Sequence, residues 1–133
     1  MPLDWGKFEN FSEDEFRCKC GCGQVNMDEA FMITLQRLRD LYRKPMTITS
    51  GYRCKNHPVE KSKQERGETG PHSMGKAADI AVGGRDAFSL MRAAAQFVEF
   101  TGYGFSQRGP WNSRFIHLDT VTDPPRPNIW SYR

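Results

Sequence analysis

Apolar residues recur every three or four positions in residues 26–44 and 86–100, and this spacing predicts two amphipathic helices. In the first helix Asn26 is a candidate N-cap, and Glu29 can complete a capping box with it. Asp86 can cap the second helix, whose run of alanines favours helix formation. The side chains expected to be buried on these helices are Phe31, Leu35, Leu38, Tyr42, Leu90, Met91, Ala94, Phe97 and Val98.

Shorter segments with alternating or β-branched apolar residues predict strands over residues 46–50, 77–82, 103–105 and 114–120. Residues 51–71 are polar and rich in lysine, glutamate and glycine, which predicts a long loop. Because long loops inside a compact domain often carry function, this loop is a candidate part of a binding site.

Both ends of the chain carry aromatic residues suited to anchoring. Residues 10–16 are expected to dock onto the domain with Phe11 and Phe16 turned inward. The proline-rich tail is expected to be extended, with Trp130 holding it by packing. Together these elements predict a single α+β domain over residues 1–133, a small, mainly antiparallel sheet with helices packed against it.

Composition narrows the classes of function. Of the 133 residues, 38% are hydrophobic and 26% are charged, which is ordinary for a soluble globular protein. No apolar run approaches the roughly 20 residues that a membrane-spanning helix needs. The net charge of +3 is spread along the chain without a basic stripe. We therefore expect no membrane or nucleic-acid partner. We also expect the protein to be a monomer.

Four cysteines leave three possibilities open. Cys18, Cys20 and Cys22 alternate with other residues in one glycine-rich segment, and Cys54 lies far along the chain. A disulfide from one of the three to Cys54 is plausible, whereas neighbours two apart rarely form one. A second zinc on four thiolates is possible, although the spacing is tighter than in a usual zinc knuckle. Free thiols are the third possibility.

Two of the three histidines lie in settings that suggest a metal site. His72 precedes a turn at Gly75, after which the chain enters a predicted strand that carries Asp79. In a second strand His117 and Asp119 share one face, because alternate strand residues point the same way. Two histidines and one carboxylate leave a fourth tetrahedral position open for water, as in catalytic zinc sites.

Three motifs in this order resemble the D-alanyl-D-alanine carboxypeptidase family of zinc peptidases, which shares its fold with the hedgehog signalling domain. The resemblance is greatest to the branch found in phage endolysins and murein endopeptidases, and it covers about residues 11–130. The motifs are Ser50-Gly51-Tyr52-Arg53, His72-x-x-Gly75-x-Ala77-x-Asp79 and His117-x-Asp119.

The resemblance implies a hydrolase that cuts peptidoglycan stem peptides, as a carboxypeptidase or an endopeptidase. It implies that Zn²⁺ is held by His72, Asp79 and His117. It also implies that Arg53 faces the cleft and binds the scissile carbonyl oxygen or a substrate carboxylate, a role that suits a permanently charged guanidinium.

The chain departs from the family at the position of the general base. Several branches place an acid three residues before the final ligand, and here that residue is Arg114. Asp119 is our first candidate for the base, and its alternative role is to orient the imidazole of His117. His57 and Glu68, both in the long polar segment, are weaker candidates.

The missing acid leaves open a non-catalytic module that binds the cell wall. A structural phage protein that keeps the zinc fold and uses it for attachment to the wall is a second alternative. The first ten residues lack the basic start and apolar stretch of a secretory signal. We therefore expect synthesis in the cytoplasm and action on the cell wall after release by another agent.

Overall fold

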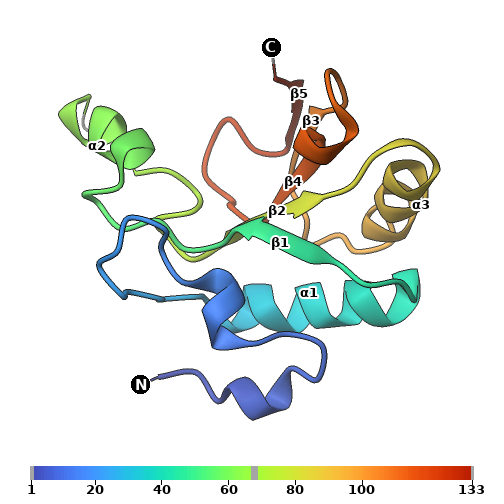
Figure 1. The fold of residues 1–133 in the computed structure, drawn as a ribbon, viewed down its shortest axis with the longest axis horizontal. Helices are drawn as coiled ribbons and strands as arrows, with labels where there is room; N and C mark the ends of the chain where they lie inside the picture. Colours follow the sequence, from blue (N-terminus) through green and yellow to red (C-terminus); the bar gives the residue numbers. More distant parts are fainter. Residues whose placement is uncertain (1, 67–68, 133) are drawn as a thin grey trace.

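The computed structural model describes residues 2–66 and 69–132 and has the predicted α+β architecture. One five-stranded sheet forms its centre, and helices pack against it (Figure 1). No helix in the described part of the chain is long and apolar enough to cross a membrane. The strands are β1 (Thr47–Ser50), β2 (Ala77–Ala81), β3 (Gly102–Ser106), β4 (Phe115–Asp119) and β5 (Asn128–Ser131).

The strands lie in the order β1-β2-β4-β3-β5, and only the β3–β5 pair is parallel. The sheet is therefore mainly antiparallel, as predicted. The fifth strand was not predicted, because the proline-rich tail was expected only to be extended. The prolines end at Pro127, and the residues that follow have free N–H groups and pair with the outer edge of β3, with Trp130 opposite Gly104.

The first helix, α1 (Glu29–Tyr42), buries the predicted apolar stripe. Its N-cap is Asp28, whose carboxylate accepts the N–H of Phe31 at 2.9 Å, so the expected cap at Asn26 is wrong. The chain before the helix is held extended, because the N–H of Asp28 donates to the carbonyl oxygen of Gly75. A contact distant in sequence thus places the start of this helix.

The helix α3 (Gly84–Ala94) is shorter than predicted and starts two residues earlier. Its N-cap is Gly83, so Asp86 lies in the first turn, where its carboxylate pairs with Lys44 at 2.7 Å. After the helix, the chain turns so that Phe100 is buried. As a result Val98, expected on the buried side, is 89% exposed.

The predicted loop over residues 51–71 contains a helix, α2 (Pro58–Glu65). Proline suits the first turn of a helix, where its missing N–H is not needed. Glu60 of this helix is fully buried, and its carboxylate accepts the hydroxyl of Ser73 at 3.0 Å. This polar contact holds the helix against the domain. Because the contact is polar, no apolar periodicity marks the helix in the sequence. In Figure 1, α2 lies on the side opposite α3.

The two faces of the sheet differ. The helices α1 and α3 contact each other and cover one face, which contributes Ile48, Ile80, Ile116 and Leu118 to the core. Three short 3₁₀ helices complete the fold. The helix η2 (Glu13–Phe16) contacts β1, and Trp5 of η1 (Trp5–Lys7) packs on the ring of Phe16. The third, η3 (Trp111–Ser113), precedes β4. Phe11 and Phe16 are buried as predicted. The opposite face carries polar side chains and forms the candidate site.

Candidate metal centre

The sheet register brings two of the candidate ligands together. Asp79 on β2 lies directly opposite His117 on the antiparallel strand β4. Their side chains point away from Ile80 and Ile116, the buried residues that follow or precede them on the core face. The Nδ1 atom of His117 lies 3.0 Å from Oδ1 of Asp79.

The third candidate ligand comes from the turn before β2. Gly75 adopts a left-handed conformation with φ 70°, which lets the chain reverse and brings His72 back over the strand. The Nε2 atom of His72 lies 3.3 Å from the same Oδ1 of Asp79. Ligand atoms of His72, Asp79 and His117 all lie within 4.8 Å of one another. The three side chains are almost fully buried.

Hydrogen bonds on the outer sides of the two rings set which nitrogens face Asp79. Nδ1 of His72 lies 2.7 Å from the carbonyl oxygen of Gly51, which can only accept, so Nδ1 carries the proton. Nε2 of His117 lies 2.7 Å from Oδ2 of Asp119, which makes Nε2 the donor. In the neutral rings, Nε2 of His72 and Nδ1 of His117 therefore present lone pairs to the Asp79 carboxylate.

Three electron-pair donors thus converge on one point, and this arrangement fits a divalent cation. The outer contacts match those that orient metal-binding histidines in proteins. Two nitrogens and one oxygen are a donor set that zinc accepts, with room for a further ligand. The residues present therefore fit a metal ion.

Without a cation, the same cluster must hold a proton. Burial raises the pKa of Asp79, but the hydrogen bond from His117 and the close approach of His72 outweigh it and hold that pKa well below its usual range. Burial lowers the pKa of His117, but hydrogen bonds to Asp119 and Asp79 outweigh it and raise the pKa. Burial lowers the pKa of His72. A metal ion would replace the proton on His117.

Asp119 is held behind His117. Its side chain has no solvent exposure, and Arg126 donates to it from Nε at 3.0 Å and from Nη2 at 2.8 Å. Gly102 on β3 lies opposite, and a Cβ there would overlap the Asp119 carboxylate. Burial raises the pKa of Asp119, but the hydrogen bonds from His117 and Arg126 lower it to about 2. This geometry favours the orienting role over that of general base.

Asp119→Asn should lower the affinity for the metal about ten- to a hundredfold, the usual effect of removing a carboxylate behind a histidine ligand. The amide can still accept from His117, but it lacks the charge that makes the imidazole a better donor to the metal. Competition with a chelator of known affinity measures the change. Asp123→Asn, on the exposed loop that follows, is the matched control. Unchanged metal affinity together with lost hydrolysis would instead support Asp119 as the base.

Arg53 lies on the other side of Asp79. Its Nη2 atom is 3.4 Å from Oδ2 of Asp79, the oxygen that does not face the histidines. Its Nε atom donates to Ser50 at 3.0 Å, and Nη1 lies 3.4 Å from Oε2 of Glu60. The guanidinium is thus fixed beside the three candidate ligands, with 17% of the side chain exposed.

The site opens into a cavity of about 530 Å³. Of the carboxylates in the described residues, only that of Asp79 lines it; three cations, Arg53, Lys63 and Arg126, line it too. His57 does not line the cavity, and Glu68 lies outside the described residues. The remaining lining residues are Val59, Pro71, His72, Phe115, His117, Asn128, Trp130 and Tyr132.

Several residues of the site were not predicted from the sequence. Arg126 stacks over Trp130 with its guanidinium carbon 4.7 Å from the ring centroid. The ring of Trp130 lies 5.3 Å from that of His117, so this tryptophan belongs to the site as well as anchoring the tail. The alternating glycines of β3, Gly102 and Gly104, were the available signal, since they leave space for Asp119 and Trp130.

Comparison with known proteins identifies the family of the chain. A family model described as peptidase M15 matches residues 9–119, which include Arg53 and the three candidate ligands. No curated protein matches the chain. Since the matched region covers most of the sequence, the chain belongs to the peptidase M15 family, whose members are metal-dependent peptidases.

Proposed function

We propose that this protein is a zinc-dependent peptidase that hydrolyses peptide bonds in bacterial peptidoglycan. The observation that carries the proposal is the convergence of His72, Asp79 and His117 at the wall of a cavity, with the outer side of each ring already hydrogen-bonded. Membership in the peptidase M15 family supplies the class of reaction.

Zinc is the ion we propose, because two imidazoles and one carboxylate are typical of its catalytic sites. When bound, zinc would lower the pKa of a water molecule towards neutrality and polarise a carbonyl group. Gly51 and Asp119 keep the ring nitrogens of His72 and His117 in the tautomers that bind metal.

Arg53 is the residue we assign to the developing negative charge on the substrate. Its guanidinium lies beside Asp79 and lines the cavity, where it can donate to a carbonyl oxygen or a terminal carboxylate. Lys63 and Arg126 add positive charge to the same cavity. Stem peptides of peptidoglycan carry free carboxylates, so an excess of cations in the cavity suits this substrate class.

The decisive experiment is digestion of purified peptidoglycan, followed by mass spectrometry of the released fragments. We expect fragments with new amino and carboxyl ends, their loss after treatment with a chelator, and their return when zinc is added. The masses also identify the bond, and hence whether the enzyme is a carboxypeptidase or an endopeptidase. Zinc-loaded protein that sediments with peptidoglycan but releases no fragments would contradict the proposal and indicate a binding module.

A further inference from the structure

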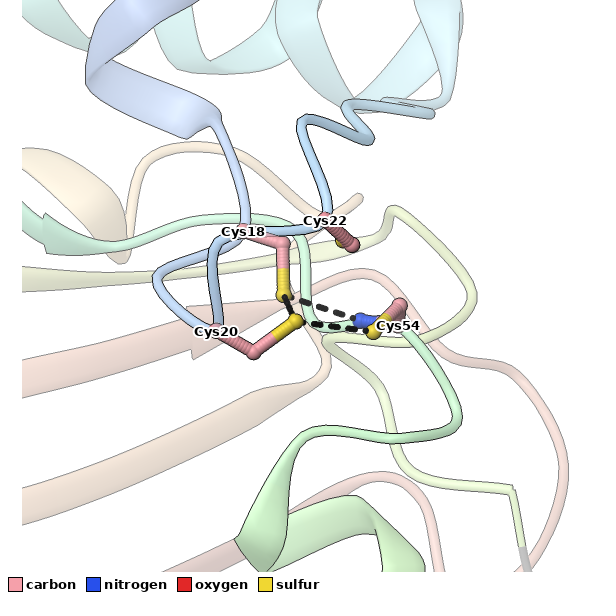
Figure 2. A group of neighbouring side chains, drawn as sticks. All are labelled: Cys18, Cys20, Cys22 and Cys54. Carbon is pink, nitrogen blue, oxygen red and sulfur yellow. Dashed lines mark hydrogen bonds between the residues drawn. The ribbon is translucent and has the colours of Figure 1, made fainter.

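The four cysteines form a second cluster, separate from the three candidate ligands described above. Cys18, Cys20 and Cys22 come from the loop after η2, and Cys54 follows the end of β1 (Figure 2). Their four sulfur atoms all lie within 4.8 Å of one another, and all four are free thiols. Two segments more than thirty residues apart thus place four soft ligands at one point.

The sulfur atoms are arranged around a common centre rather than in pairs. Sγ of Cys20 lies 3.3 Å from Sγ of Cys54 and 3.5 Å from Sγ of Cys18, so it has two neighbours at nearly the same distance. Zinc–sulfur bonds of about 2.3 Å in a tetrahedron separate the sulfurs by about 3.8 Å, close to these distances. A single disulfide would join one pair and leave the other two thiols unpaired.

Backbone N–H groups already point at two of the sulfurs. The N–H of Cys54 donates to Sγ of Cys18 at 3.3 Å, and that of Gln24 donates to Sγ of Cys22 at 3.4 Å. Such bonds favour the thiolate over the thiol. Burial raises the pKa of Cys18, but backbone N–H groups of Cys54 and Cys20 outweigh it and lower the pKa to about 7.

Four thiolates this close would repel one another strongly, and a cation removes that repulsion. In the metal-free cluster the hydrogen bonds to Cys54 and Cys22 raise the pKa of Cys20 to about 12, so this thiol keeps its proton. Metal binding displaces such protons. Cys18 and Cys54 are buried while Cys20 and Cys22 are exposed, which leaves an entry path for the ion.

We propose that Cys18, Cys20, Cys22 and Cys54 bind a second, structural zinc ion. Four sulfur ligands complete the tetrahedron, so no position stays open for water and the site is not catalytic. The ion would join the N-terminal segment to the residue that follows Arg53. It would reinforce the neighbouring contact, in which the N–H of Tyr52 donates to the carbonyl oxygen of Phe16 at 2.9 Å.

Metal analysis of the whole chain, purified under reducing conditions without chelator, tests the proposal. We expect two zinc ions per wild-type chain, one in Cys20→Ser, one in His72→Ala and none in the double variant. Cys20 is exposed, so its replacement should leave the fold intact, with a lower melting temperature. Lys19→Ser, a change in the same exposed loop that removes no thiol, is the matched control and should keep both ions.

Cobalt substitution in the wild-type protein gives a readout that requires no variant. Thiolate ligands produce intense sulfur-to-cobalt charge-transfer absorption, which a site of two histidines and an aspartate lacks. We expect this absorption in the wild type and in His72→Ala, and its loss in Cys20→Ser. Cobalt bound without charge-transfer absorption, or disulfides detected by mass in freshly reduced and repurified protein, would overturn the proposal. Either result would leave the peptidase function untouched.

Discussion

His72→Ala is expected to abolish metal binding at the candidate active site and to reduce hydrolysis of peptidoglycan to background. The imidazole supplies one of three donors around Asp79, and alanine supplies none. The remaining Asp79 and His117 pair with each other at 3.0 Å, and a proton can then take the place of the ion. Metal content per chain and the yield of released fragments measure the two effects.

His57→Ala is the matched control for metal content, since it also removes an imidazole. His57 lies at the start of α2, where its Nδ1 accepts the N–H of Val59, and it does not line the cavity. We expect this variant to keep its full complement of metal. If His72→Ala retained the zinc content of the wild type, with its cysteine cluster also mutated, the assignment of His72 as a ligand would be refuted.

Arg53→Lys is expected to lower kcat by about 10²–10³-fold, the range seen when a donor to the developing oxyanion is lost. Lysine keeps the positive charge but cannot reproduce the three directions in which Arg53 reaches Ser50, Glu60 and Asp79. Steady-state kinetics on a soluble stem peptide separate kcat from KM, and metal analysis of the same sample should show an unchanged active-site ion.

Arg37→Lys serves as the control for an arginine that does not line the cavity. Arg37 lies on α1, where its guanidinium is 3.4 Å from Glu99 and more than half of its side chain is exposed. This variant should have wild-type kinetics. A rise in KM with unchanged kcat in Arg53→Lys would show that Arg53 binds the substrate carboxylate in the ground state and does not stabilise the transition state.

Local sequence patterns predicted which helices and strands exist better than they predicted the residues at which these begin and end. The apolar stripe of α1 and the alternation in β2 and β4 are visible in the sequence, because each element must bury one face. Helix ends depend on single contacts instead. The start of α1 was misplaced because the N–H of Asp28 donates to the carbonyl oxygen of Gly75 and its carboxylate caps the helix. The helix α2 was missed because the residue that holds it, Glu60, is polar.

The sequence also pointed to the chemistry of the site but not to the roles within it. Ordered motifs singled out His72, Asp79 and His117, and the structure brings these residues together. Asp119 could not be assigned from its position beside His117 alone. In the structure, Arg126 of the irregular tail donates two hydrogen bonds to the buried carboxylate of Asp119, which lies behind the imidazole of His117.

By itself the sequence determined the fold class, the family and the residue types able to hold a metal, because periodicity and short motifs are local properties of a chain. Only the tertiary structure decided which atoms face one another. The register of β2 on β4 sets Asp79 opposite His117, and the return of the tail beside β3 brings Trp130 and Arg126 into the site. Such pairings depend on contacts between segments distant in the chain, which no local pattern encodes.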